Sequence, residues 1–421
     1  MRILQVSINF APEIISTGLY ASGVADWLSK RKHDIRTISA VPYYPAWRVF
    51  EGYSNLRYVS ETTVSGVRVT HCPLYVPQSP SGAKRIIHHI SFALTALPVA
   101  IYQAARHRPD LVMVVAPSLL SAPVGWLAAK LCGARTWLHI QDFEVEAAFA
   151  TGLLPETGWI ASLARKFESW CLRRFDVVSS ISAPMLQKLQ DKRVPPDRIS
   201  EFRNWADIAS VIPYDSPPAL KEELGIKTAF VALYSGNIAN KQGLEIIPQT
   251  ALVLQHRTDL TFVICGDGPA LIKLKQQSEG LNNIVFLPLQ PKERLGELLG
   301  VADIHLLPQI AGAADLVLPS KLTNMLASGR PVIATADHGT ALAAEVEGAG
   351  VVIPPEDSER LAEALERLLD NPSERLELGK AARKRALERW DGERILSRLE
   401  KRLLDLVDAQ PGHDAVLEEQ K

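Results

Sequence analysis

The sequence predicts an α/β protein with two domains, each built around a parallel sheet. The chain has 421 residues, 47% of them apolar, which is more than one hydrophobic core usually holds. Strand-like apolar runs alternate with helical patterns through short connections, and this is the arrangement of βαβ units. A proline-rich segment without periodicity, 212–218, interrupts the alternation and indicates an interdomain linker.

The first domain is expected at 1–206, ahead of a linker at 207–222. It opens with a strand at 3–8, a helix from Ser16 to Leu28 and a strand at 35–41. Further strands, each followed by a helix, are predicted at 111–115, 136–140 and 176–181. The stretch 111–129 is uncharged and about as long as a membrane span, but its prolines and serines favour a buried strand and a core helix.

A helix predicted over 81–108 is unusual because basic residues flank an apolar middle. Lys84 and Arg85 precede the apolar stretch 90–101, and further basic residues follow it. This pattern is typical of a helix that lies at an anionic membrane surface. An interior helix with solvated ends has the same pattern, so both interpretations stand.

The second domain is expected at 223–390, followed by a C-terminal helix and frayed tail at 391–421. Its strands are predicted at 228–233, 260–265, 283–287, 304–307 and 332–335. Before the last strand, Ser320 fits a helix start and Gly329 fits its stop. Charged helices follow at 359–369, 374–390 and 393–407.

Bulk properties exclude several classes of protein. The formal net charge is −1, and no basic block is long enough to follow a nucleic-acid backbone. The 4 cysteines form no Cys-x-x-Cys pair, so buried thiols are expected rather than metal ligands or disulfides. The first βα turn lacks Gly-x-Gly-x-x-Gly, which counts against a dinucleotide-dependent dehydrogenase. The N-terminus lacks the layout of a signal peptide, so we expect a cytoplasmic protein. The sequence has no Asp-x-Asp triplet to hold a cation, and we expect neither a metal nor a cofactor.

A diphosphate site is predicted where the first strand of the second domain ends. Gly236 permits a tight turn and a close approach of a ligand, and Lys241 precedes a helix start. Unpaired N–H groups and the positive dipole end of a helix favour a phosphate. The helix that begins at Ser320 carries Lys321 at the same edge, which strengthens the prediction. An ordinary β/α connection would give the same local pattern.

Two strand ends in the first domain carry further candidates. One strand leads into Tyr43, Tyr44 and Trp47, whose rings could floor a sugar or lipid site or simply pack a proline-rich loop. Another delivers His139 and Asp142, which could donate and accept hydrogen bonds with a substrate. The alternative for His139 is a structural partner within the domain.

Several segments taken together resemble a known family. They are 43–47, 139–146, 235–243, 266–269 and 313–324. In these segments the chain resembles the family 4 glycosyltransferases, whose GT-B architecture has two Rossmann-like domains facing across a cleft. Within that family it is similar to the WcaI-type enzymes of colanic-acid and related exopolysaccharide assembly. The resemblance covers nearly the whole chain.

The resemblance implies a set of site residues. For catalysis these are Lys241, Lys321, His139 and Asp315. For binding the nucleotide-sugar donor they are Gly236, Asn237, Gly266, Asp267, Gly268, Gln290, Ser320 and Asn324. For binding the acceptor they are Gly18, Tyr43, Tyr44, Trp47 and Asp142. No metal ligand is implied.

One pair of positions departs from the family pattern. The family often carries two glutamates, one at the donor sugar and one at the ribose. Here these positions hold Leu316 and Asn324, with Asp315 beside the first. Asp315 is the candidate substitute for the first glutamate. Asn324 can hydrogen-bond the ribose but brings no charge.

The resemblance also implies an activity. It is the retaining, metal-independent transfer of a sugar from a nucleotide diphosphate, with GDP-fucose as the implied donor. The implied acceptor is a sugar on undecaprenyl diphosphate at the inner face of the plasma membrane. Two other interpretations stay open: a nucleotide-sugar 2-epimerase of the same fold, and a non-catalytic subunit of a polysaccharide assembly complex.

Overall fold

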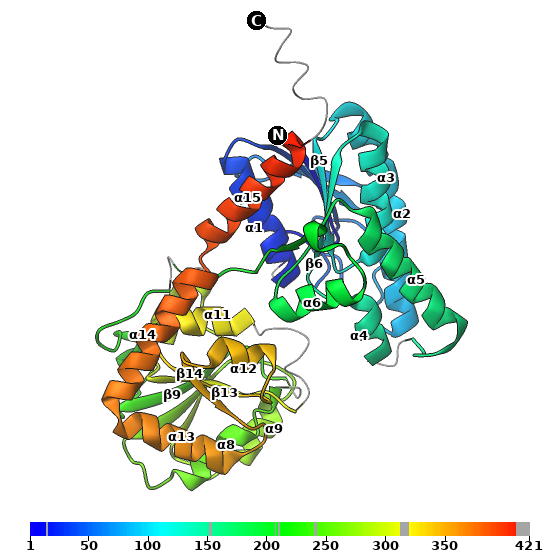
Figure 1. Cartoon of the computed structure of the whole chain (residues 1–421). Coiled ribbons are helices and arrows are strands. Elements are labelled where there is room, and N and C mark those ends of the chain that lie inside the picture. Colours follow the sequence, from blue (N-terminus) through cyan, green and yellow to red (C-terminus); the bar gives the residue numbers. More distant parts are fainter. Residues whose placement is uncertain are drawn as a thin grey trace, which may run out of the picture. The chain divides into compact units, whose positions relative to one another are not determined.

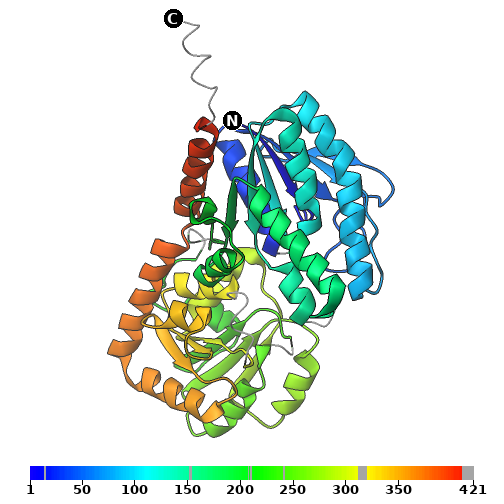
Figure 2. The same ribbon diagram turned by 45° about the vertical axis from the view of Figure 1, so that its right-hand side comes forward.

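A computed structural model describes residues 1–13, 16–150, 154–206, 208, 211–239, 242–311 and 320–409. The chain divides into two compact units, each an α/β structure (Figures 1 and 2). Unit 1 is Met1–Arg203 together with the chain from Leu396 onward, and unit 2 is Asn204–Ile395.

Unit 1 contains an eight-stranded sheet with the strand order β3-β4-β2-β1-β5-β6-β7-β8. β3 runs antiparallel to β4, and the other neighbouring pairs are parallel. The strands are β1 (Arg2–Ser7), β2 (Asp34–Ala40), β3 (Val59–Thr62), β4 (Arg68–Cys72), β5 (Leu111–Ala116), β6 (Arg135–Ile140), β7 (Val177–Ser180) and β8 (Ile199–Glu201). The helices are α1 (Ser16–Lys30), α2 (Gly82–Arg106), α3 (Ala122–Cys132), α4 (Glu144–Ala150), α5 (Gly158–Arg174) and α6 (Ala183–Asp191), joined by α15 (Gly392–Asp408).

The centre of this sheet is built from the continuous apolar runs of the sequence. Val6 of β1 pairs with Ile38 of β2 and Val114 of β5, and all three side chains are buried. The buried strand and core helix predicted over 111–129 are confirmed as β5 and α3. The edge strands β3 and β8 were not predicted, because they are short and partly exposed.

Helix α2 has one buried face and one exposed face, and its contact with a membrane stays a prediction. Its length and composition would allow it to span a membrane, which holds for no other helix in the described ranges. One face, with His88, Phe92, Ala96 and Ala100, is nevertheless buried inside unit 1. The helix lies at the periphery of the unit in Figure 2, and its remaining face is exposed.

Unit 2 contains a six-stranded parallel sheet with the order β11-β10-β9-β12-β13-β14. Its strands are β9 (Phe230–Ser235), β10 (Leu260–Cys265), β11 (Ile284–Leu287), β12 (Ile304–Leu307), β13 (Val332–Thr335) and β14 (Gly350–Ile353). Its helices are α7 (Leu220–Glu223), α8 (Ile246–Val253), α9 (Leu271–Gln277), α10 (Leu295–Val301), α11 (Ser320–Ala327), α12 (Ala341–Val346), α13 (Ser358–Asp370) and α14 (Pro372–Arg389).

Both faces of this sheet are covered by helices. Val231 and Leu233 of β9 pack into a core with α10, α11, α12 and α14. Ala232 and Tyr234 point the other way, into a core with α8, α9 and α13. Strands β10 and β11 lie on one side of β9, and β12, β13 and β14 lie on its other side. The strand order therefore reverses between β9 and β12, the place where such sheets bind ligands beyond the carboxyl ends of their strands.

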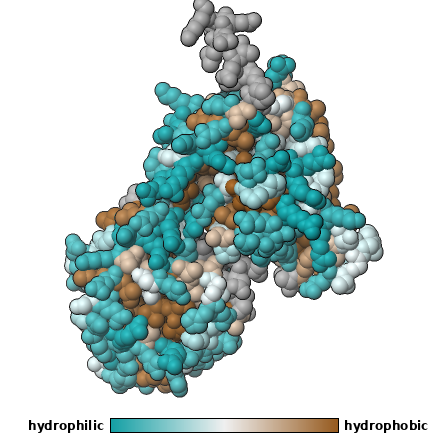
Figure 3. Space-filling view, in the orientation of Figure 1, coloured by the Kyte–Doolittle hydropathy of each residue, from teal (hydrophilic) through white to brown (hydrophobic). Residues whose placement is uncertain are grey.

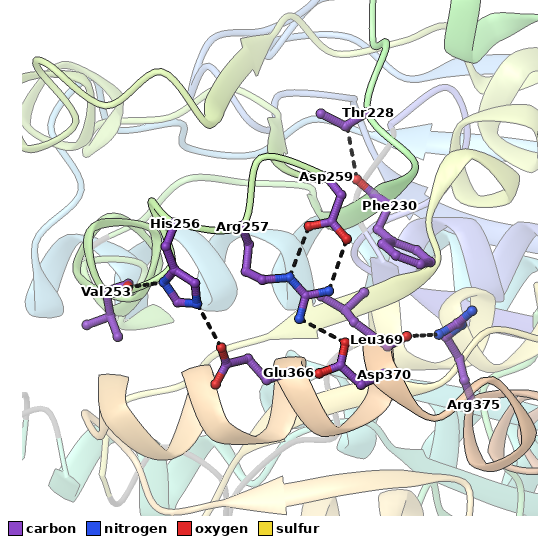
Figure 4. A network of polar contacts seen from close by, with 10 residues as sticks. All are labelled: Thr228, Phe230, Val253, His256, Arg257, Asp259, Glu366, Leu369, Asp370 and Arg375. Atoms are coloured by element: carbon purple, nitrogen blue, oxygen red, sulfur yellow. Dashed lines mark hydrogen bonds and ion pairs between the residues drawn. The ribbon is translucent and has the colours of Figure 1, made fainter.

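Polar contacts at the opposite, amino end of this sheet join the loop before β10 to α13 (Figure 4). The Arg257 guanidinium donates to both carboxylate oxygens of Asp259 at 3.0 Å and to Asp370 at 2.9 Å. Beside it, the His256 ring lies 3.1 Å from the Glu366 carboxylate. Each of these basic side chains is thus paired with a carboxylate.

The domain limits differ from those expected at two places. The predicted C-terminal helix and tail at 391–421 joins unit 1 over its described residues from Leu396 to Ala409, where Glu400 of α15 pairs with Arg31 at 2.9 Å and His33 at 2.8 Å. The described residues of the predicted linker at 207–222 belong to unit 2. Val211 there is buried, and its carbonyl accepts a hydrogen bond from Arg383 at 2.8 Å.

Candidate functional site

The predicted glycine turns after β9 and β10 lie against each other. The Gly236 N–H donates to the Cys265 carbonyl at 2.9 Å, and the Ile238 N–H donates to the Asp267 carbonyl at 2.8 Å. A Cβ atom added to Gly266 would lie 2.0 Å from the Gly236 carbonyl oxygen. No side chain fits at that distance, so the close approach of these two loops requires glycine.

The remaining residues predicted near the nucleotide follow β10 and β11. Gly268 has a φ of 154°, and a Cβ there would lie 2.4 Å from the Ile238 carbonyl oxygen. The exposed Asp267 accepts the Gly268 N–H at 2.8 Å. Gln290 is half-buried, and its amide donates to the Pro288 carbonyl at 3.0 Å. Their contact with a nucleotide stays a prediction.

Lys321, in the first turn of α11, lies across the Gly236 turn. A Cβ on Gly236 would be 2.7 Å from Lys321 Cε, so only glycine leaves this path open. The ammonium lies 4.3 Å from the centre of the Tyr234 ring and donates to the Tyr234 hydroxyl. The Gln242 amide is oriented so that its NH2 group donates to the Asn237 carbonyl. In this orientation its oxygen accepts a hydrogen bond from the Lys321 ammonium at 3.2 Å. The Tyr234 hydroxyl donates to the same Asn237 carbonyl at 2.6 Å.

All of these partners of the Lys321 ammonium are neutral. The ammonium forms no ion pair within the described part of the chain. Burial without a counter-charge lowers the pKa of Lys321 from 10.5 to about 8. A bound anion would supply the missing charge, so this arrangement favours an anionic ligand beside the Gly236 turn.

Two amide oxygens near this loop are buried without a hydrogen-bond partner in the described structure. One is Asn324 Oδ1, which is one helical turn after Lys321 on the same face of α11. The other is Gln309 Oε1, in the loop after β12. The backbone of Gln309 forms hydrogen bonds with Thr335 Oγ1 and packs against Gly243. Buried acceptors normally have a donor, and ribose hydroxyls would provide one.

Three predicted residues cannot be placed fully. Lys241 and Asp315 lie outside the described residues. Ser320 begins α11, as predicted, but its side chain is not described. The roles of all three stay predictions.

In unit 1, His139 is buried at the carboxyl end of β6. Its Nδ1 lies 2.9 Å from Ser179 Oγ, which also accepts the Trp137 Nε1–H at 2.8 Å. The Ser179 proton is best satisfied by donation to Nδ1, which leaves the His139 proton on Nε2. Nε2 has no partner in the described structure, and burial lowers the pKa of His139 to about 3. His139 is therefore a neutral imidazole with a buried Nε2–H, and its contact with a donor sugar stays a prediction.

The aromatic loop after β2 contains one buried ring and one accessible ring. Tyr43 is only 4% exposed, and its ring contacts those of His88 and Trp47 at centroid distances of 4.5 and 5.5 Å. Tyr44 is half-buried, whereas Trp47 lines a pocket of about 720 Å³. Tyr43 thus supports the Trp47 ring and has little surface of its own to offer an acceptor. Glu13 fixes the loop, since one carboxylate oxygen accepts the N–H groups of Tyr43 at 2.7 Å and Tyr44 at 2.8 Å.

The last two predicted acceptor residues lie on other elements of unit 1. Gly18 is buried in the first turn of α1, and Asp142 is exposed just after β6. Both positions are at the carboxyl edge of the sheet. Their contact with an acceptor stays a prediction.

Sequence reasoning misses three residues of this site: Glu13, Tyr234 and Gln309. Each is polar, buried or half-buried, and close to the carboxyl end of a strand. That position was a usable signal for Gln309, which directly follows a strand and a proline. Tyr234 gave no such signal because a tyrosine inside an apolar strand has the pattern of a core residue.

Two family models match the chain and divide it as the structure does. The "Glycosyl transferase 4-like domain" matches residues 17–205, and "Glycosyl transferases group 1" matches residues 217–385. A relative from Escherichia coli (strain K12) is named "Putative colanic acid biosynthesis glycosyl transferase WcaI". It is 41% identical to this chain over 379 residues. That alignment covers 88% of this chain and 92% of WcaI. The chain belongs to glycosyltransferase family 4.

Solved structures place this glycosyltransferase in the GT-B fold. Sucrose-phosphate synthase from Thermosynechococcus elongatus matches with a TM-score of 0.73 and 15% identity, over 97% of this chain and 100% of that one. HepE of Anabaena, solved with UDP-glucose, matches with a TM-score of 0.67 and 15% identity, over 96% of this chain and 100% of that one. The predicted fold and the predicted enzyme class are therefore confirmed.

Proposed function

We propose that this glycosyltransferase moves a sugar from a nucleotide diphosphate to a lipid-linked sugar, with retention at the anomeric carbon, in exopolysaccharide assembly. The similarity to WcaI supports a role in a pathway like that of colanic acid. The UDP-glucose bound to the HepE neighbour supports a nucleotide-sugar donor. The observation that carries the proposal is the Lys321 ammonium, which lies beside a glycine turn and has no counter-charge among the residues that the structure describes.

The donor diphosphate would lie against the Gly236 turn and the N-terminus of α11. There Lys321 would supply a full charge, and Lys241 a second one from the same loop. Asn324 Oδ1 and Gln309 Oε1, both without a partner among the described residues, would accept hydrogen bonds from the ribose. Donor binding would raise the pKa of Lys321 toward its usual value, because an adjacent anion favours the protonated form.

The chemical step follows from the charge on the leaving group. As the glycosyl phosphate bond breaks, negative charge grows on the diphosphate and positive charge grows on the sugar ring. Preorganised donors at the diphosphate can stabilise this transition state by about 3–4 kcal/mol each. The acceptor oxygen would attack the anomeric carbon from the side of the leaving group and lose its proton to it, as retention without a protein nucleophile requires. His139 would hold a donor-sugar hydroxyl.

The exposed face of α2 supports a membrane-bound acceptor. Ile87, Ile90, Leu94 and Ile101 are 41–65% exposed and recur at helical spacing on one face. Lys84 and Arg85 precede this row and are also exposed. An apolar row with a basic end suits an anionic lipid surface. The surface in Figure 3 is mostly hydrophilic, with apolar patches.

The test is a transfer assay on the full chain with lipid-linked acceptor extracted from bacterial membranes. GDP-fucose, UDP-glucose and other labelled nucleotide sugars are supplied one at a time. We expect label in the lipid fraction with one donor, and no label there for a Lys321→Met variant. Conversion of a nucleotide sugar without acceptor would identify an epimerase instead. Nucleotide binding without turnover would identify a non-catalytic subunit.

A further inference from the structure

The hydroxyl of Tyr234 lies in a core that does not need it for packing. Tyr234 is near the end of β9 and is fully buried, in the core that this strand forms with α8, α9 and α13. A phenylalanine would fill nearly the same space. A buried hydroxyl costs free energy unless it is hydrogen-bonded, so its presence indicates a role beyond packing.

All the hydrogen-bonding capacity of this hydroxyl is used beside the Gly236 turn. It donates to the Asn237 carbonyl at 2.6 Å. It accepts hydrogen bonds from the Lys321 ammonium and from the Gln242 NH2 group. A hydroxyl has one proton and two lone pairs, and an ammonium can only donate. The hydroxyl proton is therefore given to the turn, and a lone pair faces Lys321.

The Lys321 side chain is held along both the turn and this tyrosine. A Cβ atom on Gly236 would lie 3.1 Å from Lys321 Cδ, 2.7 Å from Cε and 3.0 Å from Nζ. Nζ also lies 4.3 Å from the centre of the Tyr234 ring, which is within the range of a cation–π contact. The last three atoms of the side chain thus have contacts along their length, and the position of the ammonium is set before a ligand binds.

A lysine that binds an anion gains from such support in two ways. Its long side chain has several rotatable bonds, and a ligand that has to order them binds more weakly. A fold that orders them in advance removes this cost. A hydroxyl lone pair also favours the protonated form of the amine, and so opposes the burial that lowers the pKa of Lys321.

We propose that Tyr234 is a positioning residue, whose hydroxyl holds the Lys321 ammonium beside the Gly236 turn where it contacts the donor diphosphate. The same hydroxyl holds the Asn237 carbonyl, so one group fixes the charge relative to the turn. Tyr234 acts through Lys321, since its own ring and hydroxyl are buried. This assignment rests on the proposed function, in which Lys321 binds the diphosphate.

The experiment measures how the full chain binds a nucleoside diphosphate when only the hydroxyl is removed. The probe is GDP, UDP or ADP, whichever gives wild type the largest thermal shift, titrated calorimetrically at pH 7. We expect Tyr234→Phe to bind it about five- to tenfold more weakly, the factor that corresponds to ordering one long side chain. The parent nucleoside should bind as it does to wild type. Tyr214→Phe is the matched control, a half-buried tyrosine of unit 2 whose ring packs against Gly300 of α10.

A double-mutant cycle separates positioning from a purely structural role. If the hydroxyl acts through Lys321, Tyr234→Phe should cause no further loss of diphosphate affinity in a Lys321→Met background. An equal loss in both backgrounds would assign the hydroxyl to the turn alone, through Asn237, and overturn the proposal. Tighter binding by Tyr234→Phe would also overturn it, because the hydroxyl would then compete with the ligand for the ammonium.

The pH profile gives a readout that a loss of packing would not move. The hydroxyl accepts a hydrogen bond from the charged form of Lys321, so its removal should lower the pKa of this lysine further. We expect kcat/KM for sugar transfer to fall from a lower pH in Tyr234→Phe than in wild type. A fall at the same pH in both proteins would contradict the assignment.

The failure of this inference is distinguishable from the failure of the proposed function. If Lys321→Met binds the nucleoside diphosphate as wild type does, the diphosphate assignment fails and the positioning role fails with it. If Lys321→Met binds it weakly and Tyr234→Phe binds it as wild type does, only the role of Tyr234 is wrong.

Discussion

The two ends of the sheet in unit 2 treat positive charge in opposite ways. At the amino end, Arg257 is held by the carboxylates of Asp259 and Asp370, and these contacts raise its pKa. At the carboxyl end, Lys321 contacts a phenol and an amide, and burial lowers its pKa to about 8. One cation is paired within the fold, and the other has no ion-pair partner among the described residues.

We interpret this difference as one between a residue that stabilises the fold and a residue proposed to bind a ligand. Arg257 joins the start of β10 to α13, so its contacts hold two elements together. Lys321 lies in a partly buried position without a counter-charge in the described part of the chain, which costs folding free energy. A fold keeps such a residue when its charge serves another purpose, and functional sites are where perturbed pKa values gather.

The largest effect is expected from removing the unpaired cation. Lys321→Met keeps the length of the side chain and removes its charge, so kcat should fall about 100- to 1,000-fold, as when other preorganised charge-stabilising groups are lost. The thermal midpoint should stay constant or rise, because a buried unpaired charge has been removed. A variant with normal kcat would contradict the diphosphate assignment. Lys130→Met, a surface change in unit 1 on an exposed lysine, serves as the control.

A smaller effect is expected from adding a methyl group at Gly236, where the Lys321 side chain passes over the turn. In Gly236→Ala the added Cβ would lie 2.7 Å from Lys321 Cε, at a φ of 135° that alanine adopts only with strain. We expect a loss of kcat/KM of about tenfold and a loss of stability of about 1 kcal/mol. Gly52→Ala, where a Cβ meets open space at a φ of 85°, shows the effect of backbone strain alone. Equal kinetic effects in the two variants would mean that the path of Lys321 is irrelevant.

The pH dependence tests the same contrast without a mutation. The kcat/KM reports the free enzyme, so it should fall above about pH 8 as Lys321 loses its proton. Stability should respond with the opposite sign. The folded pKa is about 8 and the ordinary value is 10.5, so the unfolded chain binds more protons between these values. The Lys321 contribution to stability therefore rises with pH across this window. Both effects should be missing in Lys321→Met, and a pH profile shared by wild type and variant would refute them.

The smallest effect is expected at the paired end. Arg257→Gln should lower the free energy of unfolding by about 1 kcal/mol, since partly exposed ion pairs contribute little each. Its kcat and both KM values should match wild type. Chemical denaturation and steady-state kinetics on the same preparation check both statements. A kinetic defect in a normally folded Arg257→Gln protein would remove the distinction between the two ends.

Much of the fold was predictable because its central strands are continuous apolar runs. The predicted bounds of β10, β12 and β13 agree with the structure to the residue, and each of these strands is fully buried. β3 and β14 were not predictable in this way. β3 has the sequence VSET and is mostly exposed, so it lacks an apolar run. β14 has the apolar sequence GVVI, but it is only four residues long and mostly half-buried.

The site was predictable where it depends on local chemistry. Gly236 and Lys321 follow from a strand end and a helix start, which are local features. The role of Tyr234 depends on a contact with a residue 87 positions away, which no local pattern encodes. No local pattern shows which ring of the aromatic loop stays accessible either. Packing against His88 buries Tyr43 and leaves Trp47 at the pocket.

The most direct measurement is calorimetric titration of wild type and Lys321→Met with a nucleoside diphosphate at pH 7. Thermal shifts with GDP, UDP and ADP first identify the nucleotide to use. If Lys321 holds the diphosphate, the variant should bind that nucleotide at least tenfold more weakly and bind the parent nucleoside as wild type does. Equal affinity of both proteins for the diphosphate would contradict the account.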